Sequence, residues 1–374
     1  MTQATGKDVK CVVWDLDGTL WDGVLTESGT VALKPEIPTI LRTLDERGIL
    51  LSIASKNNFE DAAAKLREEG LWDYFLYPEI HWGAKSESIA RIRQNLNIGA
   101  DSILFIDDDP FERDEVATTH TEVQCAAAET YGELVADRRL IPRFITSDSA
   151  RRRQMYVEDD QRKRAEETFT GPNEAFLESL GMRFAISRAG EHDLERAVEL
   201  TVRTNQLNAT GKTYSYEELD AFRRSDRHAL YMCELTDVYG SYGKIGLALV
   251  EKNETTWHLR LLLMSCRVMS RGVGTVLLGF IMREAARAGV RLLADFVPTD
   301  RNRAMLVAFK FNGFRDTDTR DGSAPSDTLK ILEADLSRAP PFPDYLVVTT
   351  PSQIEEEAAR TPVKSRQDRQ VNQP

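Results

Sequence analysis

The sequence lacks most features of secreted, membrane-spanning and zinc-binding proteins. It has four cysteines in 374 residues, none in a Cys-x-x-Cys pair or near a histidine at metal-ligand spacing, which disfavours a zinc site. The first residues, MTQATGKDVK, have no apolar core of a secretory signal, and no apolar run approaches the roughly 20 residues that span a bilayer. We therefore expect a cytoplasmic protein with reduced thiols and no membrane partner.

The chain also has no excess of positive charge. Lys and Arg number 48 against 60 Asp and Glu, which gives a net charge of −12. A chain with this balance is a poor candidate for sequence-independent nucleic-acid binding, which needs a basic surface, so we expect no nucleic-acid partner. The length exceeds what one ordinary core covers, and two domains with a tail are expected.

Short apolar runs alternate with helical patterns over residues 1–145. The runs KCVVWDL, ILLSIAS and SILFID indicate buried strands, and IPTILRTLDERG and NFEDAAAKLREEG have helical spacing. Alternating strands and helices predict an α/β domain with a parallel, doubly wound sheet. The segments between these strands are too short to hold a cap domain over the strand ends.

The remaining chain has a different pattern. We interpret residues 146–170 as a charged helical linker, either a solvated helix or a contact for an acidic partner. Residues 171–336 contain several successive strands and a long amphipathic helix, GVGTVLLGFIMREAARAG, which predict an α+β domain. Residues 337–374 are predicted to be mostly disordered.

Polar residues follow the predicted strands of the first domain. Asp15 and Asp17 follow CVVW, Ser55 ends the second strand, and Asp107 and Asp108 end a later one. Ligands bind outside the carboxyl ends of strands in such sheets. A carboxylate can be a nucleophile or an acid/base group, and Mg²⁺ prefers carboxylates together with phosphate oxygens. The sequence therefore predicts a magnesium-dependent phosphoryl-transfer site.

The motifs WDLDGTLWDGVL, IASKN, AKSESI and FIDDDPFER resemble, in this order, the four motifs of the haloacid dehalogenase-like superfamily. The resemblance implies that Asp15 is the nucleophile and Asp17 the acid/base. It assigns substrate binding to Ser55, Lys56, Asn57 and Lys85, and Mg²⁺ binding to Asp15, Asp17, Asp107 and Asp108. Arg113 in the fourth motif either holds a distant phosphate or pairs with a neighbouring carboxylate. Turn and helix-cap roles are the plain alternative for these carboxylates.

Cys266 ends a predicted strand in LLLMSCRVMSRGVGTVLL, with Arg267 and Arg271 nearby. Positive charge favours the thiolate, although a cysteine at a strand end is often a small buried residue. The turn RGVGTVLL and the later NRAMLVAFKFNGF resemble the acyl-CoA-binding region of the GCN5-related N-acetyltransferase fold. Met269 stands where that family usually has Gln or Arg, which argues against acetyl-CoA as the ligand.

Both domains, in this order, with WDLDGTLWDGVL, DDDPFER, RTNQLN and SCRV, resemble the FkbH-like proteins of polyketide pathways over about residues 9–335. The resemblance implies transfer of a glyceryl group from 1,3-bisphosphoglycerate, a phosphorylated glycolytic metabolite, to an acyl carrier protein, with dephosphorylation. It also implies that Cys266 carries the glyceryl thioester. Asn205 is a candidate for binding glyceryl hydroxyls or pantetheine amides, and His258 and Asp237 for acid/base or orienting roles, against a turn or cap role for each.

Two other functions are compatible with the sequence. One is a magnesium-dependent phosphatase of another metabolite or protein, with a passive second domain. The other is a scaffold that binds a carrier protein without turnover. A replacement of Cys266 separates the first from the glyceryl transferase, and carrier binding without turnover identifies the second.

Overall fold

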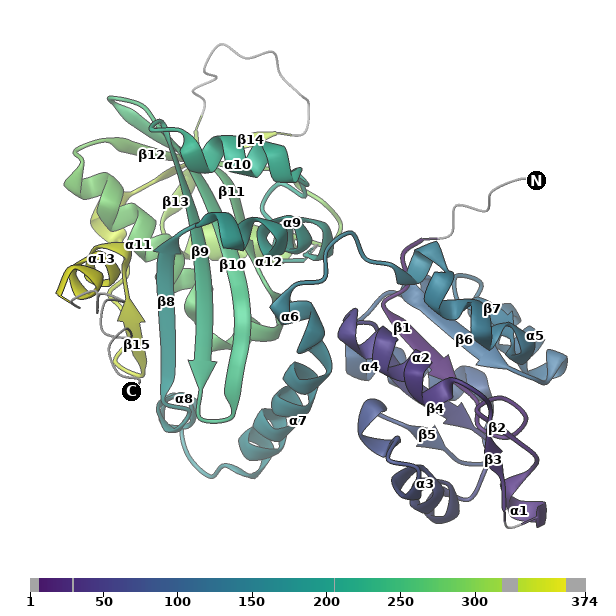
Figure 1. Ribbon diagram of the computed structural model, residues 1–374. Helices are drawn as coiled ribbons and strands as arrows, with labels where there is room; N and C mark the ends of the chain where they lie inside the picture. Colours follow the sequence, from purple (N-terminus) through teal and green to yellow (C-terminus); the bar gives the residue numbers. More distant parts are fainter. Residues whose placement is uncertain (1–6, 29, 205, 318–328, 361–374) are drawn as a thin grey trace, which may run out of the picture. The chain divides into compact units, whose positions relative to one another are not determined.

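The computed structural model describes residues 7–28, 30–204, 206–317 and 329–360. The chain divides into two compact units, Met1–Arg164 and Ala165–Pro374 (Figure 1). In the described ranges we find no helix with the length and apolar character needed to cross a membrane.

The N-terminal unit is built on a parallel five-stranded sheet with the order β5-β4-β1-β6-β7. Its strands are β1 (Cys11–Trp14), β4 (Leu50–Ser55), β5 (Glu79–Ile80), β6 (Ile103–Asp107) and β7 (Gln124–Ala127). Val13 of the central strand β1 pairs with Ser52 on one side and with Phe105 on the other. Because all five strands run in the same direction, the residues that follow them collect at one edge.

Helices cover both faces of this sheet. They are α2 (Ile37–Glu46) and α3 (Phe59–Glu68) on one face, and α4 (Lys85–Leu96) and α5 (Pro110–Thr119) on the other. Side chains of β1 alternate between the two layers: Val12 and Trp14 join the core under α2 and α3, and Cys11 and Val13 join the core under α4 and α5. The predicted doubly wound α/β fold is confirmed.

No cap domain interrupts the described part of this unit. The segment after β1 forms the small hairpin β2 (Trp21–Asp22) and β3 (Ala32–Leu33) with the one-turn helix α1 (Leu25–Ser28). The segment between α3 and α4 contains only η1 (Trp72–Tyr74) and β5. The carboxyl ends of the strands are therefore not roofed by an inserted domain of their own unit.

The N-terminal unit extends further along the chain than residue 145. After β7 come η3 (Ala128–Ala136), η4 (Arg138–Leu140), α6 (Ser147–Ala150) and α7 (Arg152–Thr168), and the boundary between the units falls inside α7. Arg153 explains this position, because it pairs with Asp45 at 2.9 Å and donates to the Asp73 carbonyl at 2.8 Å. The start of the charged helix is thus attached to the first unit and is not a separate linker.

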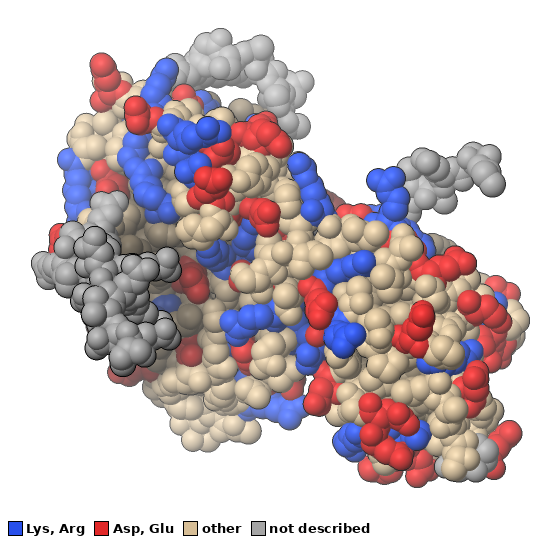
Figure 2. All heavy atoms as spheres, in the orientation of Figure 1, with Lys and Arg blue, Asp and Glu red and all other residues tan. Residues whose placement is uncertain are grey.

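Charged side chains of both signs mix on the face drawn in Figure 2. Within α7, Arg162 pairs with Asp159 at 3.0 Å and Arg164 with Asp160 at 2.7 Å, both one turn apart. Pairs at this spacing support a helix by a few tenths of a kcal/mol each. Much of the charge of residues 146–170 is therefore balanced within the helix itself.

The C-terminal unit has a mixed eight-stranded sheet with the order β13-β14-β12-β11-β10-β9-β8-β15. Its strands are β8 (Met182–Arg188), β9 (His228–Asp237), β10 (Gly240–Lys252), β11 (Thr256–Met264), β12 (Arg291–Phe296), β13 (Phe314–Asp316), β14 (Lys330–Ala334) and β15 (Leu346–Thr349). The pairs β11–β12 and β8–β15 are parallel, and the other neighbours are antiparallel.

The helices of this unit are α8 (Asn173–Ser179), α9 (Leu194–Arg203), α10 (Tyr216–Arg224), α11 (Val273–Arg287), α12 (Arg303–Phe311) and α13 (Pro351–Arg360). The buried sides of α8, α11 and α12 share one core with the sheet. The predicted α+β architecture is confirmed, with the long amphipathic helix as α11.

Strands β11 and β12 pair over only four residues each, Thr256–Leu259 with Arg291–Ala294.

The prediction that residues 337–374 are mostly disordered is wrong for the part that the structure describes. Residues 346–349 form β15, which pairs in register with β8, Leu346 opposite Met182, and Leu346 is buried. Helix α13 follows. A four-residue strand beside PPFP gives too short a pattern to recognise, and it becomes stable only through its partner β8. Residues 361–374 lie outside the described residues.

Candidate active site

The ends of β1 and β6 bring two carboxylates together. Asp15 directly follows β1, and Asp107 is the last residue of β6. Trp14 pairs with Ile106, and the Asp15 amide donates to the Ile106 carbonyl at 2.9 Å, so the backbone pairing continues up to the site. This placement follows from the parallel sheet, as the sequence predicts.

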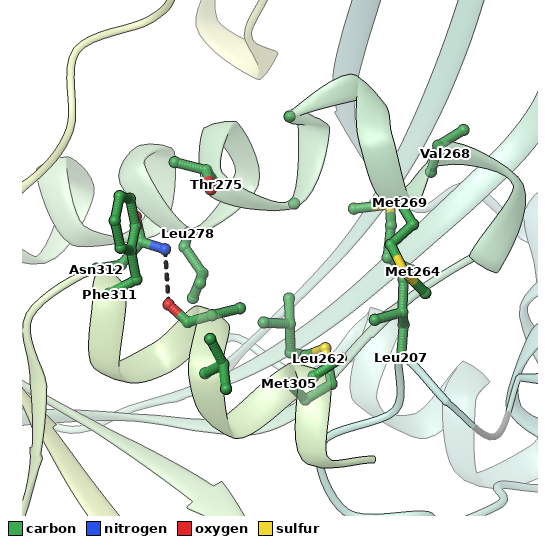
Figure 3. A pocket seen from close by; sticks show the side chains of 15 residues that line it. Leu207, Leu262, Met264, Val268, Met269, Thr275, Leu278, Met305, Phe311 and Asn312 are labelled. Atoms are coloured by element: carbon green, nitrogen blue, oxygen red, sulfur yellow. Dashed lines mark hydrogen bonds between the residues drawn. The ribbon is translucent and has the colours of Figure 1, made fainter. Parts of the chain in front are cut away.

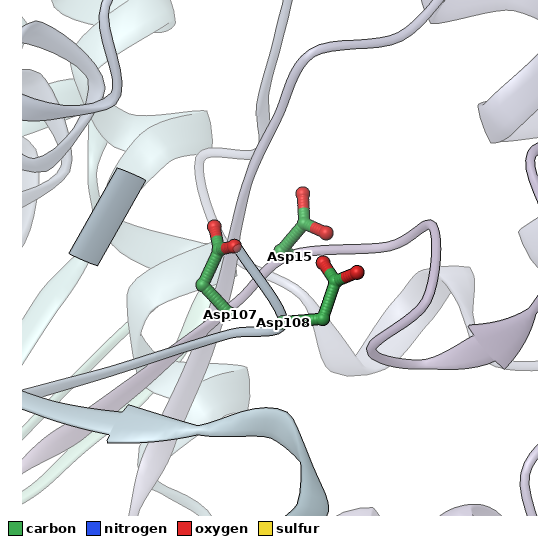
Figure 4. A group of neighbouring side chains, drawn as sticks. All are labelled: Asp15, Asp107 and Asp108. Atoms are coloured by element: carbon green, nitrogen blue, oxygen red, sulfur yellow. The ribbon is translucent and has the colours of Figure 1, made fainter. Parts of the chain in front are cut away.

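A third carboxylate completes an oxygen cluster. One oxygen each of Asp15, Asp107 and Asp108 lies within 4.8 Å of the other two (Figure 4). Mg²⁺ is a hard cation that takes oxygen ligands and keeps places for water or phosphate oxygens. A set of three carboxylates with no nitrogen or sulfur ligand therefore fits Mg²⁺.

Lys85 lies against this cluster. It is the first residue of α4, and its buried ammonium donates to Asp15 Oδ1 at 2.7 Å and to Asp107 Oδ2. One ammonium thus pairs with two of the three carboxylates, and the excess negative charge of the cluster attracts a divalent cation. The ammonium itself is positioned to offset charge on a bound phosphoryl group.

Burial shapes the electrostatics of the cluster. It raises the pKa of Asp15 to about 6; the Lys85 ammonium opposes this shift and the Asp107 carboxylate adds to it. Burial also raises the pKa of Asp107, again against Lys85. Desolvation disfavours both charged carboxylates, and a nearby cation restores them. Burial therefore disfavours the charged form of both carboxylates more than the Lys85 ammonium favours it.

Asp108 is held by the turn after β1. The Asp108 amide donates to Thr19 Oγ1 at 3.0 Å. Gly18 has a φ of +68°, and a Cβ on it would lie 2.4 Å from Asp108 Oδ2. A side chain at Gly18 would therefore be strained by the backbone conformation and would displace the Asp108 carboxylate.

Ser55 ends β4 at the same edge of the sheet. Its side chain is buried, and its Oγ has no hydrogen-bond partner among the described residues. A buried hydroxyl without a partner costs free energy unless a ligand or water satisfies it. Such a hydroxyl agrees with the predicted role of Ser55 in holding a phosphoryl oxygen.

Asp17, which the sequence predicts as a metal ligand, lies outside the three-carboxylate cluster. Its oxygens accept hydrogen bonds from Trp21 Nε1, the Leu25 amide and Asn57 Nδ2. Asn57, predicted to bind substrate, donates from its side-chain amide to Asp17 Oδ2. The reason is geometric: the hairpin after β1 and the loop after β4 both turn their donors toward Asp17.

Two other predicted substrate ligands are engaged with protein groups. Lys56 pairs with Glu112 Oε1 at 2.6 Å. Arg113 Nη1 donates to the carbonyls of Asp107 and Asp108 at 2.7 and 2.9 Å, and the described residues show no ion pair between Arg113 and a carboxylate. Lys56 therefore links the loop after β4 to α5, and Arg113 holds the chain between β6 and α5.

Sequence reasoning missed Gly18, Thr19 and Trp21 as supporting residues, and Glu112 as the partner of Lys56. The first three lie inside the motif WDLDGTLWDGVL, which was the available signal. Their roles depend on which side chain reaches which carboxylate, and spacing along the chain does not specify this.

Cys266 is exposed and begins η6 (Cys266–Arg271), two residues after β11 ends. The two arginines expected to favour its thiolate have other partners. Arg267 donates to the Tyr242 carbonyl at 2.9 Å, and buried Arg271 pairs with Glu166 at 3.2 Å. Cys266 thus lies just after a strand end, as predicted, and both flanking arginines also bond to groups other than its thiol.

A cavity of about 260 Å³ lies between η6, α11 and α12 (Figure 3). Its deeper wall is apolar and buried, formed by Leu207, Leu262, Met264 and Met305. Its rim carries exposed apolar side chains, Met269, Val307 and Phe311. Cys266 is not among the lining residues, although Met264 and Val268 on either side of it are. The cavity suits a slender, largely apolar group.

Three further candidates have separate outcomes. Asn205 lies outside the described residues. His258 Nε2 lies 2.7 Å from Asp295 Oδ1, across the neighbouring strands β11 and β12, without the geometry of a hydrogen bond. Asp237 accepts hydrogen bonds from the amides of Tyr239 and Gly240 and from the Tyr242 hydroxyl, which is the turn role that the sequence offered as its alternative.

Comparison with known proteins supports the interpretation of the N-terminal site as a magnesium-dependent phosphatase site. No family model matches the chain. Human magnesium-dependent phosphatase 1 is 30% identical over 119 residues, which cover 27% of this chain and 68% of the relative.

Solved structures resemble each unit separately. The phosphatase-containing N-terminal part of the protein BF1531 from Bacteroides fragilis, complexed with Mg, is 31% identical over 32% of this chain, with a TM-score of 0.30; the chain spans only 36% of that protein. The ribosomal-protein-S18-alanine N-acetyltransferase from Escherichia coli is 17% identical and matches 40% of this chain and 92% of its own, with a TM-score of 0.31.

The sequence relationship to the human enzyme and the carboxylate cluster agree with each other. Three carboxylates that fit Mg²⁺, beside a buried lysine and an unpartnered serine hydroxyl, are the groups that magnesium-dependent phosphate chemistry requires. The chain therefore belongs, through its N-terminal unit, to the haloacid dehalogenase-like family of magnesium-dependent phosphatases, with Mg²⁺ as its cofactor.

Proposed function

We propose that this chain transfers a glyceryl group from 1,3-bisphosphoglycerate to the phosphopantetheine thiol of an acyl carrier protein, and removes phosphate at the N-terminal site. The proposal rests on one observation: a magnesium-dependent phosphatase site is followed, in the same chain, by an exposed cysteine just after a strand end, and Met264 and Val268 on either side of this cysteine line an apolar cavity. The product would be a three-carbon unit for polyketide biosynthesis.

The phosphatase step uses the residues of the N-terminal edge. An Asp15 carboxylate oxygen attacks phosphorus and forms an aspartyl-phosphate as the ester oxygen leaves. Lys85 and the Ser55 hydroxyl hold phosphoryl oxygens, and Asp17 gives a proton to the leaving oxygen and then takes one from the attacking water. Asp15, Asp107 and Asp108 would hold Mg²⁺, which supplies positive charge to the transferring phosphoryl group.

The transfer step is assigned to Cys266. Its thiolate attacks the carboxyl carbon of the acyl phosphate, the carbon–oxygen bond breaks, and inorganic phosphate leaves. The carrier thiol then attacks the Cys266 thioester, a new carbon–sulfur bond forms, and the Cys266 thiolate departs. Both sides of this exchange are a thiol and a thioester, so no further activation is needed.

The cavity supports a carrier arm as the ligand. Its volume of about 260 Å³ lies just below the usual range of ligand pockets, roughly 300–1,000 Å³. A pantetheine arm is slender and carries methyl groups, which match the apolar floor at Leu262 and Met264. The exposed rim residues Val307 and Phe311 offer apolar contact to the protein that presents the arm.

The proposal includes a cytoplasmic location, where a glycolytic metabolite and an acyl carrier protein are both present. It includes no nucleic-acid or membrane partner. The competing function is a magnesium-dependent phosphatase of another metabolite, with a passive C-terminal unit.

Intact-protein mass spectrometry tests the proposal. The protein is mixed with Mg²⁺ and freshly generated 1,3-bisphosphoglycerate, with and without a holo carrier protein. We expect a glyceryl adduct on the wild type and on Cys125→Ala, its loss in Cys266→Ala, and its passage to the carrier. Equal phosphate release by all three proteins with no adduct would instead establish the phosphatase with a passive second unit.

A further inference from the structure

The carboxylate of Asp17 is enclosed by three hydrogen-bond donors from two segments. Oδ1 accepts from Trp21 Nε1 at 2.7 Å and from the Leu25 amide at 3.1 Å. Oδ2 accepts from Asn57 Nδ2 at 2.9 Å. Trp21 and Leu25 come from the hairpin segment after β1, and Asn57 comes from the loop after β4.

The donors are fixed in place. Trp21 is 0% exposed and Asn57 is 1% exposed. The backbone of Trp21 pairs with Leu33 in the hairpin, and its side chain belongs to the core under α2 and α3. The Asn57 side-chain oxygen accepts from the Asn58 amide at 2.9 Å, so its amino group is the end that faces Asp17.

Counting acceptor sites distinguishes the two oxygens of Asp17. A carboxylate oxygen has about two lone-pair sites. Both sites of Oδ1 are taken, by Trp21 and by the Leu25 amide, whereas Oδ2 has one donor and one site left. Hydrogen bonds from neutral donors hold the carboxylate in a single orientation, since rotation would break all three.

We propose that Trp21 and Asn57 are positioning residues for phosphoryl transfer, and that Oδ2 is the atom through which Asp17 exchanges its proton. This proposal rests only on the phosphatase part of the proposed function and not on glyceryl transfer. The hairpin after β1 thereby orients the acid/base group, a task that requires neither a cap domain nor the second unit.

The proton step is balanced at this atom. As the bond between phosphorus and the leaving oxygen breaks, the proton on Oδ2 moves to that oxygen while Asp15 bonds to phosphorus. Water then attacks phosphorus, its proton returns to Oδ2, and the bond from Asp15 to phosphorus breaks. Oδ1 keeps its two donors throughout, so that only one oxygen changes its proton.

Leaving-group dependence provides a sharp test. Dinitrophenolate leaves without a proton, whereas phenolate needs one, so misplacing Asp17 slows phenyl phosphate more than 2,4-dinitrophenyl phosphate. Trp21→Phe keeps an aromatic side chain, removes part of its volume and removes the donor. We expect kcat for phenyl phosphate to fall roughly tenfold to a hundredfold, while kcat for the dinitrophenyl ester and the Mg²⁺ dependence change little.

Trp14→Phe is the matched control. Trp14 is also fully buried in the same core, but its indole nitrogen has no hydrogen-bond partner among the described residues. Its replacement removes the same volume and should affect both esters equally. Asn57→Leu should reproduce the selective loss of Trp21→Phe through the other oxygen.

The proposal fails if Trp21→Phe and Asn57→Leu slow the two esters by the same factor, or leave both unchanged. Trp21 and Asn57 would then be packing residues only. Failure of the phosphatase assignment looks different, because the wild type would then hydrolyse neither ester in the presence of Mg²⁺.

Discussion

Replacing Asp15 with asparagine should stabilise the metal-free protein, although it removes the nucleophile. Burial raises the pKa of Asp15 from 3.8 to about 6. The folded protein therefore holds this proton more tightly than the unfolded chain does, and the stability of the wild type falls as the pH rises between about 4 and 6. A pKa difference of roughly two units between the folded and unfolded states corresponds to about 3 kcal/mol in the free energy of unfolding.

Asparagine resembles the protonated carboxyl and cannot ionise. Without divalent cations, Asp15→Asn should exceed the wild type in free energy of unfolding by about 3 kcal/mol at pH 8 and match it near pH 4. Mg²⁺ should reverse the order at pH 8, because it binds the folded wild type and stabilises it by mass action.

Urea unfolding from pH 4 to 8 with a chelator measures this difference. Four of the five tryptophans, Trp14, Trp21, Trp72 and Trp82, lie in the N-terminal unit, so their fluorescence reports on the unit that carries Asp15. Two results would contradict a raised pKa of Asp15 in the folded protein. One is a variant no more stable than the wild type at pH 8, and the other is a difference in free energy of unfolding that does not change with pH.

Three other replacements have distinct expected outcomes. Gly18→Ala should weaken the apparent Mg²⁺ affinity at least tenfold, seen in the Mg²⁺ dependence of phosphatase activity, because its Cβ displaces Asp108; an unchanged dependence would contradict this. Lys85→Met should lower kcat by about a hundredfold or more, and near-normal turnover would argue against its role. Lys56→Met should leave KM within about twofold, since Lys56 already pairs with Glu112; a large rise in KM would restore Lys56 as a phosphate ligand.

The fold of the N-terminal unit could be predicted because its signals are local and repeated. Apolar runs such as CVVW and SILFI mark strands that are buried on both faces, and the parallel arrangement then places Asp15 and Asp107 at one edge. Lys85 was predictable for the same reason, because it is the first residue of α4, the helix that follows β5.

Side-chain partners within the site were not predictable from spacing. Asn57 and Lys56 follow the same strand end as Ser55, and both side chains have protein partners. The Ser55 hydroxyl has none among the described residues. Which of several neighbouring polar groups faces the ligand depends on contacts across the fold, such as Asn57 with Asp17 and Lys56 with Glu112.

Long-range pairing also limits prediction at the C-terminal end. Strand β15 pairs with β8, which lies more than 150 residues earlier in the chain. Nothing local to LVVT specifies that partner. Arg267 and Arg271 illustrate the same limit for charge, because both are near Cys266 in sequence and bond to other groups in the structure.

Phosphate release from a small phosphate ester, measured as a function of Mg²⁺ for the wild type and for Asp15→Asn, tests the central assignment most directly. We predict turnover by the wild type that depends on Mg²⁺ and disappears on chelation, and no turnover by Asp15→Asn even though the variant is folded. Phosphate release by Asp15→Asn at a rate near that of the wild type would contradict the site described above.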